Sequence, residues 1–260
     1  MASLKEIKQR IASVRKTQQI TRAMKMVAAS KMKRATQAII STRPYADKLQ
    51  TLVGNLFQDA LEFGIQFAEQ RHVETVTLVV ISSDKGLCGG FNANVRKRTS
   101  AAIADYLSKG IKVKIMPVGR KACEFCRKFL EVETISEHPM IFQHLQFDVA
   151  VKISNELKKL FLDDKTDKIE IIYNRFKSAL EQIPSTETYL PLEMPAKTEK
   201  AKNDYIYEPN RVELVSLLIP RHLNTHVWKI LLESNASEQA ARMMAMDSAT
   251  ENAGDLIKSM

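Results

Sequence analysis

The chain has 260 residues, of which 45% are hydrophobic and 27% are charged, and its formal net charge at pH 7 is +9. These fractions are ordinary for a folded soluble protein, and the absence of any run of about 18 apolar residues excludes a membrane-spanning helix. The N-terminus lacks the apolar core of a secretory signal. Three cysteines, Cys88, Cys123 and Cys126, give no disulfide framework and indicate a reducing compartment.

The net charge is concentrated in the first 34 residues. This segment contains ten basic residues and one acid, whereas residues 35–260 hold 29 basic and 29 acidic residues and are neutral overall. A long helix with one sign of charge, attached to a neutral body, predicts an acidic partner. The basic residues are Lys5, Lys8, Arg10, Arg15, Lys16, Arg22, Lys25, Lys31, Lys33 and Arg34.

Residues 1–60 are predicted as an N-terminal coiled-coil helix with a kink near Arg43 and Pro44. The apolar residues step by three and four, as in a coiled-coil seam. A helix of about 40 residues would be about 60 Å long, so part of it must project or pack on a partner. The predicted seam is Leu4, Ile7, Ile11, Val14, Thr17 or Gln18, Ile20 or Thr21, Met24, Val27 or Ala28, Met32, Ala35 and Ile39.

Residues 74–195 alternate between strand and helix patterns, which predicts an α/β domain with a mostly parallel sheet. The run at 75–82 is continuously apolar, as in a strand buried on both faces. Further strands are expected at 111–118, 132–135, 168–174 and, on the sheet edge, 185–192. Helices are expected at 92–109, 120–129 and 147–161.

Residues 196–210 are polar and charged and are predicted to be a connection, and residues 211–260 form a C-terminal helix in which Pro220 marks a kink. Small residues fill the distal half of its seam, which allows a partner helix to approach closely. The simplest architecture pairs the two terminal helices as an antiparallel coiled coil, with the α/β domain at one end. The predicted seam is Leu223, Val227, Ile230, Ser234, Ser237, Ala241, Met244 and Ser248.

The loop Ser-Asp-Lys-Gly-Leu-Cys-Gly-Gly-Phe-Asn at 83–92 follows a predicted buried strand and opens a helix, which is the context of a phosphate-binding turn. It matches neither G-x-x-x-x-G-K-[ST] nor G-x-G-x-x-G. A tight turn that uses glycines at positive φ is therefore favoured over a nucleotide site.

Two other motifs have the spacing of chemical sites. Cys123 and Cys126 form a single C-x-x-C within a predicted helix, and without a second pair or a nearby histidine we interpret them as incidental. His222 and His226 are four apart on a helix, but no acid lies beside them on that helix face, so a metal site is not favoured.

The basic N-terminal helix has three possible explanations: a solvated face, a nucleic-acid contact or a contact with an acidic protein surface. Acids that would support the helix through i,i+4 pairs are nearly absent. Aromatic residues for base stacking are also missing from this segment.

Four segments closely resemble the gamma subunit family of F-type ATP synthases. They are Met-Ala-Ser-Leu-Lys-Glu-Ile at 1–7, Thr-Gln-Gln-Ile-Thr-Arg-Ala-Met-Lys-Met-Val-Ala-Ala-Ser-Lys at 17–31, the loop at 83–92, and Ser-Glu-Gln-Ala-Ala-Arg-Met-Met-Ala-Met at 237–246. The resemblance implies a Rossmann-like central domain and an antiparallel coiled coil of the two terminal helices.

The resemblance also implies a function. In this family the coiled coil is a rotor shaft inside a ring of alternating alpha and beta subunits, and it couples proton flow through the membrane c-ring to ATP synthesis or hydrolysis at the beta subunits. The globular domain lies next to the epsilon subunit and the c-ring. A non-catalytic subunit without cofactor, metal or nucleic-acid partner is therefore expected. Its expected place is the cytoplasmic face of a bacterial plasma membrane, as a peripheral protein.

Two sets of partner contacts follow from the resemblance. Exposed charges in such contacts are individually weak, which suits a rotating bearing. The expected contacts with a beta-subunit loop and bearing are Met24, Lys25, Lys31, Lys33, Arg34, Gln239 and Arg242. The expected contacts of the central loop are Lys85, Gly86, Cys88, Gly89 and Gly90.

The chain departs from the family pattern in one place. Family members continue past the position of Met260 with a Tyr-Asn-x-Ala-Arg-Gln segment, so the C-terminal helix is expected to be shortened here. The redox-regulatory insertion of the plastid form is absent, and thiol regulation is not implied. The alternatives are a basic coiled-coil nucleic-acid-binding protein and, more remotely, a Rossmann-type enzyme.

Overall fold

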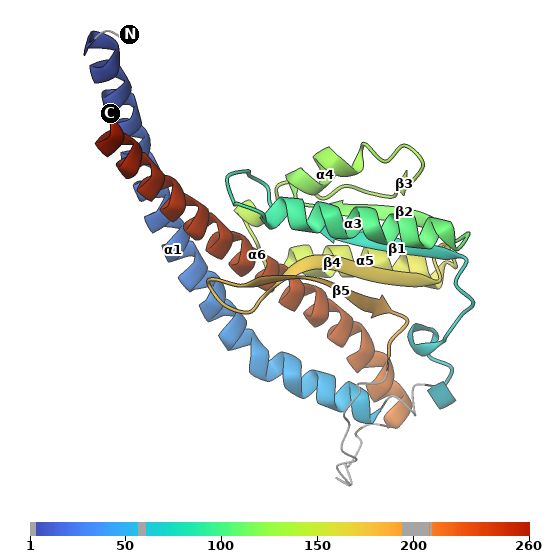
Figure 1. Cartoon of the computed structure of the whole chain (residues 1–260). Coiled ribbons are helices and arrows are strands. Elements are labelled where there is room, and N and C mark those ends of the chain that lie inside the picture. The colour runs from blue at the N-terminus through green and yellow to red at the C-terminus, as the bar shows by residue number, and fades with distance from the viewer. Residues whose placement is uncertain (1–3, 57–60, 194–207, 209) are drawn as a thin grey trace.

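Two long helices pack side by side and extend beyond an α/β body (Figure 1). The computed structural model describes residues 4–56, 61–193, 208 and 210–260. Helix α1 spans Leu4–Asn55 and helix α6 spans Arg211–Ser259, and the ends marked N and C lie at the same tip, so the pair is antiparallel. The connection predicted at 196–210 lies almost entirely outside the described residues.

Pro44 and Pro220, which the sequence predicts as kinks, both lie within continuous helices. Helix α1 runs through Pro44 and its axis turns toward the body in its second half, while α6 runs through Pro220 (Figure 1). The N-terminus of α6 is capped by Asn210, whose side-chain oxygen accepts a hydrogen bond from the backbone N–H of Glu213 at 2.9 Å.

The body contains a five-stranded sheet in the order β3-β2-β1-β4-β5. The strands are β1 (Thr75–Ile81), β2 (Lys112–Val118), β3 (Glu133–Thr134), β4 (Lys168–Phe176) and β5 (Gln182–Leu190). Strands β1, β2, β3 and β4 are parallel to one another, and β5 pairs antiparallel with β4 at the edge. The prediction of a mostly parallel sheet with an added edge strand is therefore confirmed.

Helices cover both faces of this sheet because successive residues of each strand point to opposite sides. On one face, Val76, Leu78 and Val80 pack against α3 (Phe91–Ser108) and α4 (Arg120–Cys126). On the other face, Val79 and Ile81 join a larger core with α5 (Phe147–Leu162) and α6. Two short 3-10 turns, η1 (Gln66–Ala68) and η2 (Ile141–Gln143), complete the described elements.

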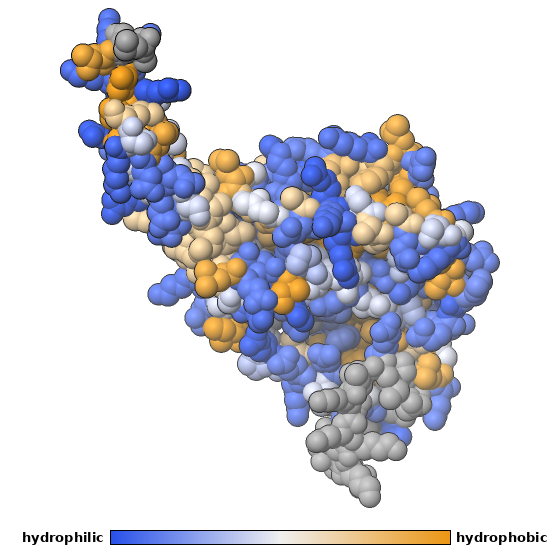
Figure 2. Space-filling view, in the orientation of Figure 1, coloured by the Kyte–Doolittle hydropathy of each residue, from blue (hydrophilic) through white to orange (hydrophobic). Residues whose placement is uncertain are grey.

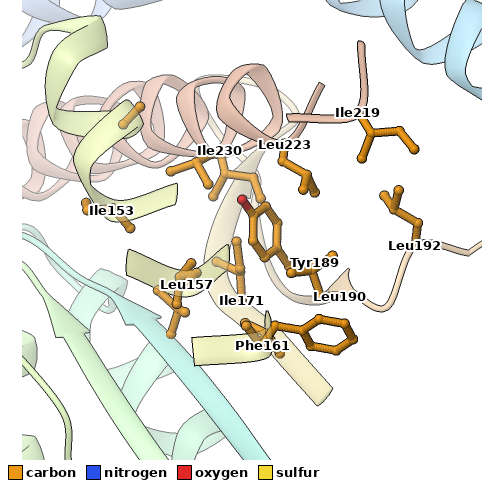
Figure 3. Close-up of a cluster of buried hydrophobic side chains, with 14 of the residues drawn as sticks. Ile153, Leu157, Phe161, Ile171, Tyr189, Leu190, Leu192, Ile219, Leu223 and Ile230 are labelled. Atoms are coloured by element: carbon orange, nitrogen blue, oxygen red, sulfur yellow. The ribbon is translucent and has the colours of Figure 1, made fainter. Parts of the chain in front are cut away.

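The larger core joins the body to the helix pair. Figure 3 shows side chains of α5, β4, β5 and α6 pointing into one apolar cluster around Tyr189, which is 1% exposed. The end of α1 also enters this core through Leu49 and Val53, followed by Leu56 directly after the helix. The burial of these apolar side chains in one shared core fixes α6 to the body.

The seam between the helices follows the heptad spacing on α1, and the structure resolves its alternatives. Thr21 and Ala28 are buried, whereas Ile20 and Val27 are 60% and 56% exposed. On α6 one predicted seam position is wrong, because Ser248 is exposed and Met246 is buried instead. Leu4 is 78% exposed because α1 extends beyond the last turn of α6 (Figure 1). None of the described helices is long and apolar enough to span a membrane.

Candidate functional site

A groove of about 410 Å³ lies where α1, α6, the loop after β1 and the turn η2 meet. It brings together five of the predicted partner contacts, which come from three separate parts of the sequence: Met24, Lys31, Lys85, Gln239 and Arg242. We call it the interhelical groove. Its other lining residues are Ile20, Ala23, Val27, Ala28, Asp84, Phe142, Gln143 and Glu238.

The groove combines apolar walls with a cationic rim. Ile20 and Val27 are largely exposed along α1, next to the half-buried Met24. Lys31 and Lys85 are exposed. Figure 2 shows hydrophilic side chains along the projecting helix pair, with apolar residues between them. Such a surface fits a partner segment that carries both an apolar side chain and a carboxylate.

The acids of the groove already have partners within the chain. Asp84 is buried and accepts hydrogen bonds from the backbone N–H groups of Arg120 at 3.1 Å and Phe142 at 2.9 Å. Glu238 pairs with Arg242 at 2.6 Å. Burial raises the pKa of Glu238, and the adjacent Arg242 guanidinium opposes that rise. The charges left for an outside partner are therefore mainly positive.

Arg242 fastens α6 to the central loop. Its guanidinium donates to the backbone carbonyls of Gly86 and Lys85, the latter at 3.2 Å, as well as to Glu238. Its side chain is only 12% exposed. Arg242 therefore positions the loop from inside the chain, and a partner meets the surface that it shapes.

The central loop, residues 83–90, is packed onto α6. Cys88 is 2% exposed and forms a small cluster with Phe91 and with Ala241 of α6. Gly89 has φ +55°, and a Cβ there would lie 3.6 Å from the Cβ of Ala245, so a positive-φ turn is confirmed at this glycine. Leu87 also has positive φ, whereas Gly86 and Gly90 do not.

Hydrogen bonds inside the loop hold Cys88 in place. The Ser83 hydroxyl lies 2.9 Å from Asn92 Oδ1, and Asn92 Nδ2 donates to Cys88 Sγ at 3.2 Å. Burial is the largest cause that raises the pKa of the Cys88 thiol. Of the predicted loop contacts, Lys85, Gly89 and Gly90 are exposed, Gly86 is partly exposed, and Cys88 lies inside.

Three of the predicted contacts, Lys25, Lys33 and Arg34, do not line the groove. Lys25 forms an ion pair with Asp247 of α6. Lys33 and Arg34 are exposed on α1. Gln239 lines the groove but is 7% exposed, so it contributes to the floor.

The place where open α/β sheets bind nucleotides is occupied in this chain by its own side chains. Such sheets bind ligands at the carboxyl ends of the strands where the strand order reverses, which here is between β1 and β4. Asn174 of β4 is 1% exposed and donates to the backbone carbonyl of Phe91 at 2.9 Å. Phe91 in turn packs against Ala241 of α6. This arrangement agrees with a structural role for the loop.

Cys123 and Cys126 are buried in α4. Burial raises the pKa of Cys123 to about 11 and that of Cys126 to about 12, so both remain thiols at neutral pH. Within the described ranges, no three His, Cys, Asp or Glu side chains gather as a metal site.

Sequence reasoning missed a polar cluster around His226. The rings of His222 and His226 stack at 6.0 Å, and His226 Nε2 lies 3.2 Å from Glu187 Oε2 on β5. Burial is the main cause that lowers the pKa of His222 to about 4. The acid partner was not expected because it comes from a strand and not from the helix that carries the histidines.

Comparisons with known proteins agree on one family. A family model described as ATP synthase matches residues 3–260. The ATP synthase gamma chain of Prosthecochloris aestuarii is 42% identical over 99% of this chain and 89% of its own length. That of Christiangramia forsetii is 46% identical over 98% of this chain and 89% of its own length.

Solved structures show the same similarity. The central stalk and c-ring structure of Tetrahymena thermophila mitochondrial ATP synthase contains a chain that is 27% identical, with a TM-score of 0.67. The match covers 88% of the present chain and 99% of the Tetrahymena chain. A chain of the Euglena gracilis mitochondrial ATP synthase shares the fold, with a TM-score of 0.68 over 97% of the present chain and 84% of its own length.

Proposed function

Because this chain belongs to the ATP synthase gamma family and forms the central rotor shaft of that enzyme, we propose that the interhelical groove is the surface on which the shaft bears against the catalytic ring. The single observation that carries this proposal is the convergence of Met24, Lys31, Lys85, Gln239 and Arg242 in one groove. The comparisons give no support to the nucleic-acid-binding alternative.

The partners in this proposal are the alternating alpha and beta subunits around the helix pair, with the epsilon subunit and the c-ring at the body. Proton flow turns the c-ring and the shaft with it, and the turning shaft drives the beta-subunit sites through their conformations. The chain itself does no bond chemistry. It is peripheral, on the cytoplasmic face of the membrane.

The physical properties of the groove suit a moving contact. Exposed ion pairs contribute about 1 kcal/mol or less each, so an acidic segment meeting Lys31 and Lys85 is attracted without being held at one angle. The apolar side chains of Ile20, Met24 and Val27 add contact that does not depend on precise direction. Arg34, three residues after Lys31, lies on the same side of α1 and extends this positive surface.

The shape of the shaft supports the same function. Figure 1 shows that the helix pair projects from one side of the body and that α1 changes direction along its length. A shaft without rotational symmetry presents a different surface to each subunit of a surrounding ring. Rotation can therefore place identical ring subunits in different states.

The substitution Met24→Lys tests the groove as a bearing. It places a further cation beside Lys31, which strengthens the attraction to an acidic segment and retards release. We expect ATP hydrolysis to continue while the protons pumped per ATP fall several-fold. The measurement is ATP-driven proton uptake and ATP turnover of the assembled complex in inverted membrane vesicles.

Met26→Lys is the matched control, because Met26 lies on the same helix and is 63% exposed but does not line the groove. It should leave the protons pumped per ATP unchanged. Equal pumping ratios for wild type and Met24→Lys would contradict the proposal, as would equal losses in both variants.

A further inference from the structure

A polar cluster with two buried and two partly exposed side chains joins α6 to the sheet at the point where the helix pair meets the body. Tyr173 of β4 is 2% exposed and its hydroxyl donates to Glu187 Oε1 of β5 at 2.5 Å. The same hydroxyl lies 3.4 Å from Oε2 of Glu233 on α6. The other oxygen of Glu187 lies 3.2 Å from His226 Nε2 on α6. We call Tyr173, Glu187, His226 and Glu233 the junction cluster.

The cluster contacts α6 at two points on one face. His226 and Glu233 are seven residues apart, which places them two turns apart on the same side of the helix, about 10 Å along its axis. Tyr173 and Glu187 approach this face from two adjacent strands. The hydrogen bonds among the four side chains can therefore all form in only one position of the helix relative to the sheet.

Displacement of α6 would separate Glu233, which is 8% exposed, and the partly exposed Glu187 from their hydrogen-bond partners across the junction. Burial raises the pKa of Glu233, while the charges of Lys229 and Arg175 oppose that rise. Burial alone would raise the pKa of Glu187, but its hydrogen bonds to His226 and Tyr173 outweigh that effect and lower it. A buried carboxylate that loses its hydrogen-bond partners is strongly destabilising.

The apolar contacts around the junction cluster select a single position of α6 less sharply than the cluster does. Leu223, Val227, Ile230 and Leu231 bury α6 against the body through apolar side chains. Apolar burial is strong but not directional, so a small rotation or slide of α6 exchanges one set of such contacts for another. Directional groups are what specify a single register between helices.

We propose that the junction cluster fixes the rotational and axial position of α6 on the α/β body, so that rotation of the body reaches the projecting helix pair without slip. This proposal rests on the function of the chain as a rotor shaft. Tyr173, Glu187, His226 and Glu233 are positioning residues, because they act on the shaft and not on the nucleotide.

Tyr173→Phe is the most direct test, because it removes the bridging hydroxyl and keeps the ring. In the assembled complex in inverted vesicles, we expect the protons pumped per ATP to fall about two-fold or more, the lower end of the effects found along packed networks. ATP hydrolysis should be retained, since slip reduces the opposing load.

Tyr189→Phe is the matched control. Tyr189 is as deeply buried, and its hydroxyl lies 2.8 Å from Ser154 Oγ of α5. The Tyr189 ring also lies 6.0 Å from the His226 ring, and phenylalanine keeps that ring, so the variant removes a buried hydrogen bond outside the junction cluster and leaves the contact with His226 in place. We expect the pumping ratio of Tyr189→Phe to equal that of wild type. Equal ratios in both variants, or equal losses, would overturn the proposal.

A second variant covers failure of assembly. Glu187→Gln keeps an oxygen that accepts the Tyr173 hydrogen bond but removes the charge opposite His226, so it should also lower the pumping ratio. If both junction variants fail to assemble while Tyr189→Phe assembles, the cluster has only a structural role and the proposal is wrong. A wild-type chain that fails to assemble or pump contradicts the rotor function itself, which distinguishes the two failures.

Discussion

The half of the helix pair near the body, which we call the proximal half, and the half toward the tip, which we call the distal half, are built from different side chains. Near the body, the contacts of α1 and α6 are large and apolar, as at Leu49, Val53 and Leu223, and they belong to the main core. Toward the tip, small residues hold most of the buried positions, although Met246, Glu238 and Gln239 are buried there as well. The small residues are Thr21, Ala28, Ala35, Ser234, Ala236, Ser237, Ala240, Ala241 and Ala253. The proximal half is therefore part of the folded body, while the distal half is a thin helix pair.

Small side chains let the two distal helices approach closely, and polar contacts between them fix their register. The hydroxyls of Thr21 and Thr250 lie 2.8 Å apart, and Gln18 Nε2 donates to the backbone carbonyl of Thr250 at 3.3 Å. A Cβ at Gly254 would lie 2.9 Å from Gln18 Nε2, so a larger residue there would require the end of the flexible Gln18 side chain to move aside. The distal half gains a narrow cross-section at the cost of apolar burial.

Leu223→Ala should have the largest effect, because it removes a fully buried side chain from the proximal half. We expect the free energy of unfolding to fall by about 3 kcal/mol, from lost burial and the cavity that remains. Chemical denaturation followed by circular dichroism measures this change. Leu217→Ala, the same substitution at a site on α6 that is 55% exposed, should change stability far less. Equal losses of unfolding free energy in Leu223→Ala and Leu217→Ala would show that burial in the proximal half does not stabilise the chain as argued.

Ala28→Leu tests the close packing of the distal half. Ala28 is 1% exposed between the helices, and a larger side chain there forces the helices apart at a cost of about 1–3 kcal/mol. Hydrogen exchange should speed up in the distal parts of α1 and α6 and remain slow in the sheet. Ala12→Leu, on an exposed position of α1, is the control. An unchanged rate of hydrogen exchange in Ala28→Leu would mean that the distal seam accommodates a larger side chain without separation of the helices.

The same contrast explains how much of the fold the sequence could predict. The α/β order and the two terminal helices follow from periodicity, and β5 starts only three residues before its predicted position. The choice between Ile20 and Thr21, or between Val27 and Ala28, could not be made, because each pair differs by one step and only the position of α6 decides it.

The candidate site was predictable residue by residue but not as an arrangement. The motifs predicted Met24, Lys31, Lys85 and Arg242, but not that they would share a groove. The main hydrogen bonds of Arg242 go to backbone carbonyls, which have no sequence pattern. The contact between Glu187 and His226 joins a strand to a helix across 39 positions, so no local spacing indicates it.

The smallest expected effect belongs to Lys25→Ala, which removes an ion pair from the distal half. The side chains of Lys25 and Asp247 are 39% and 32% exposed, so solvent and salt screen the pair. We expect a loss of unfolding free energy of about 1 kcal/mol or less at low salt, and a smaller loss at high salt. Lys33→Ala, on an exposed cation outside the groove, is the control for removing a charge from α1.

The salt dependence decides what holds the distal half together. A loss that disappears at high salt means that the small residues and hydroxyl contacts are sufficient, and that Lys25 is free to exchange Asp247 for an acid of the catalytic ring as the shaft turns. A large loss that persists at high salt would mean that the pair is structural, and Lys25 could then not serve as a moving contact. Asp247→Asn separates the two roles, because it removes the internal partner while leaving the Lys25 ammonium in place.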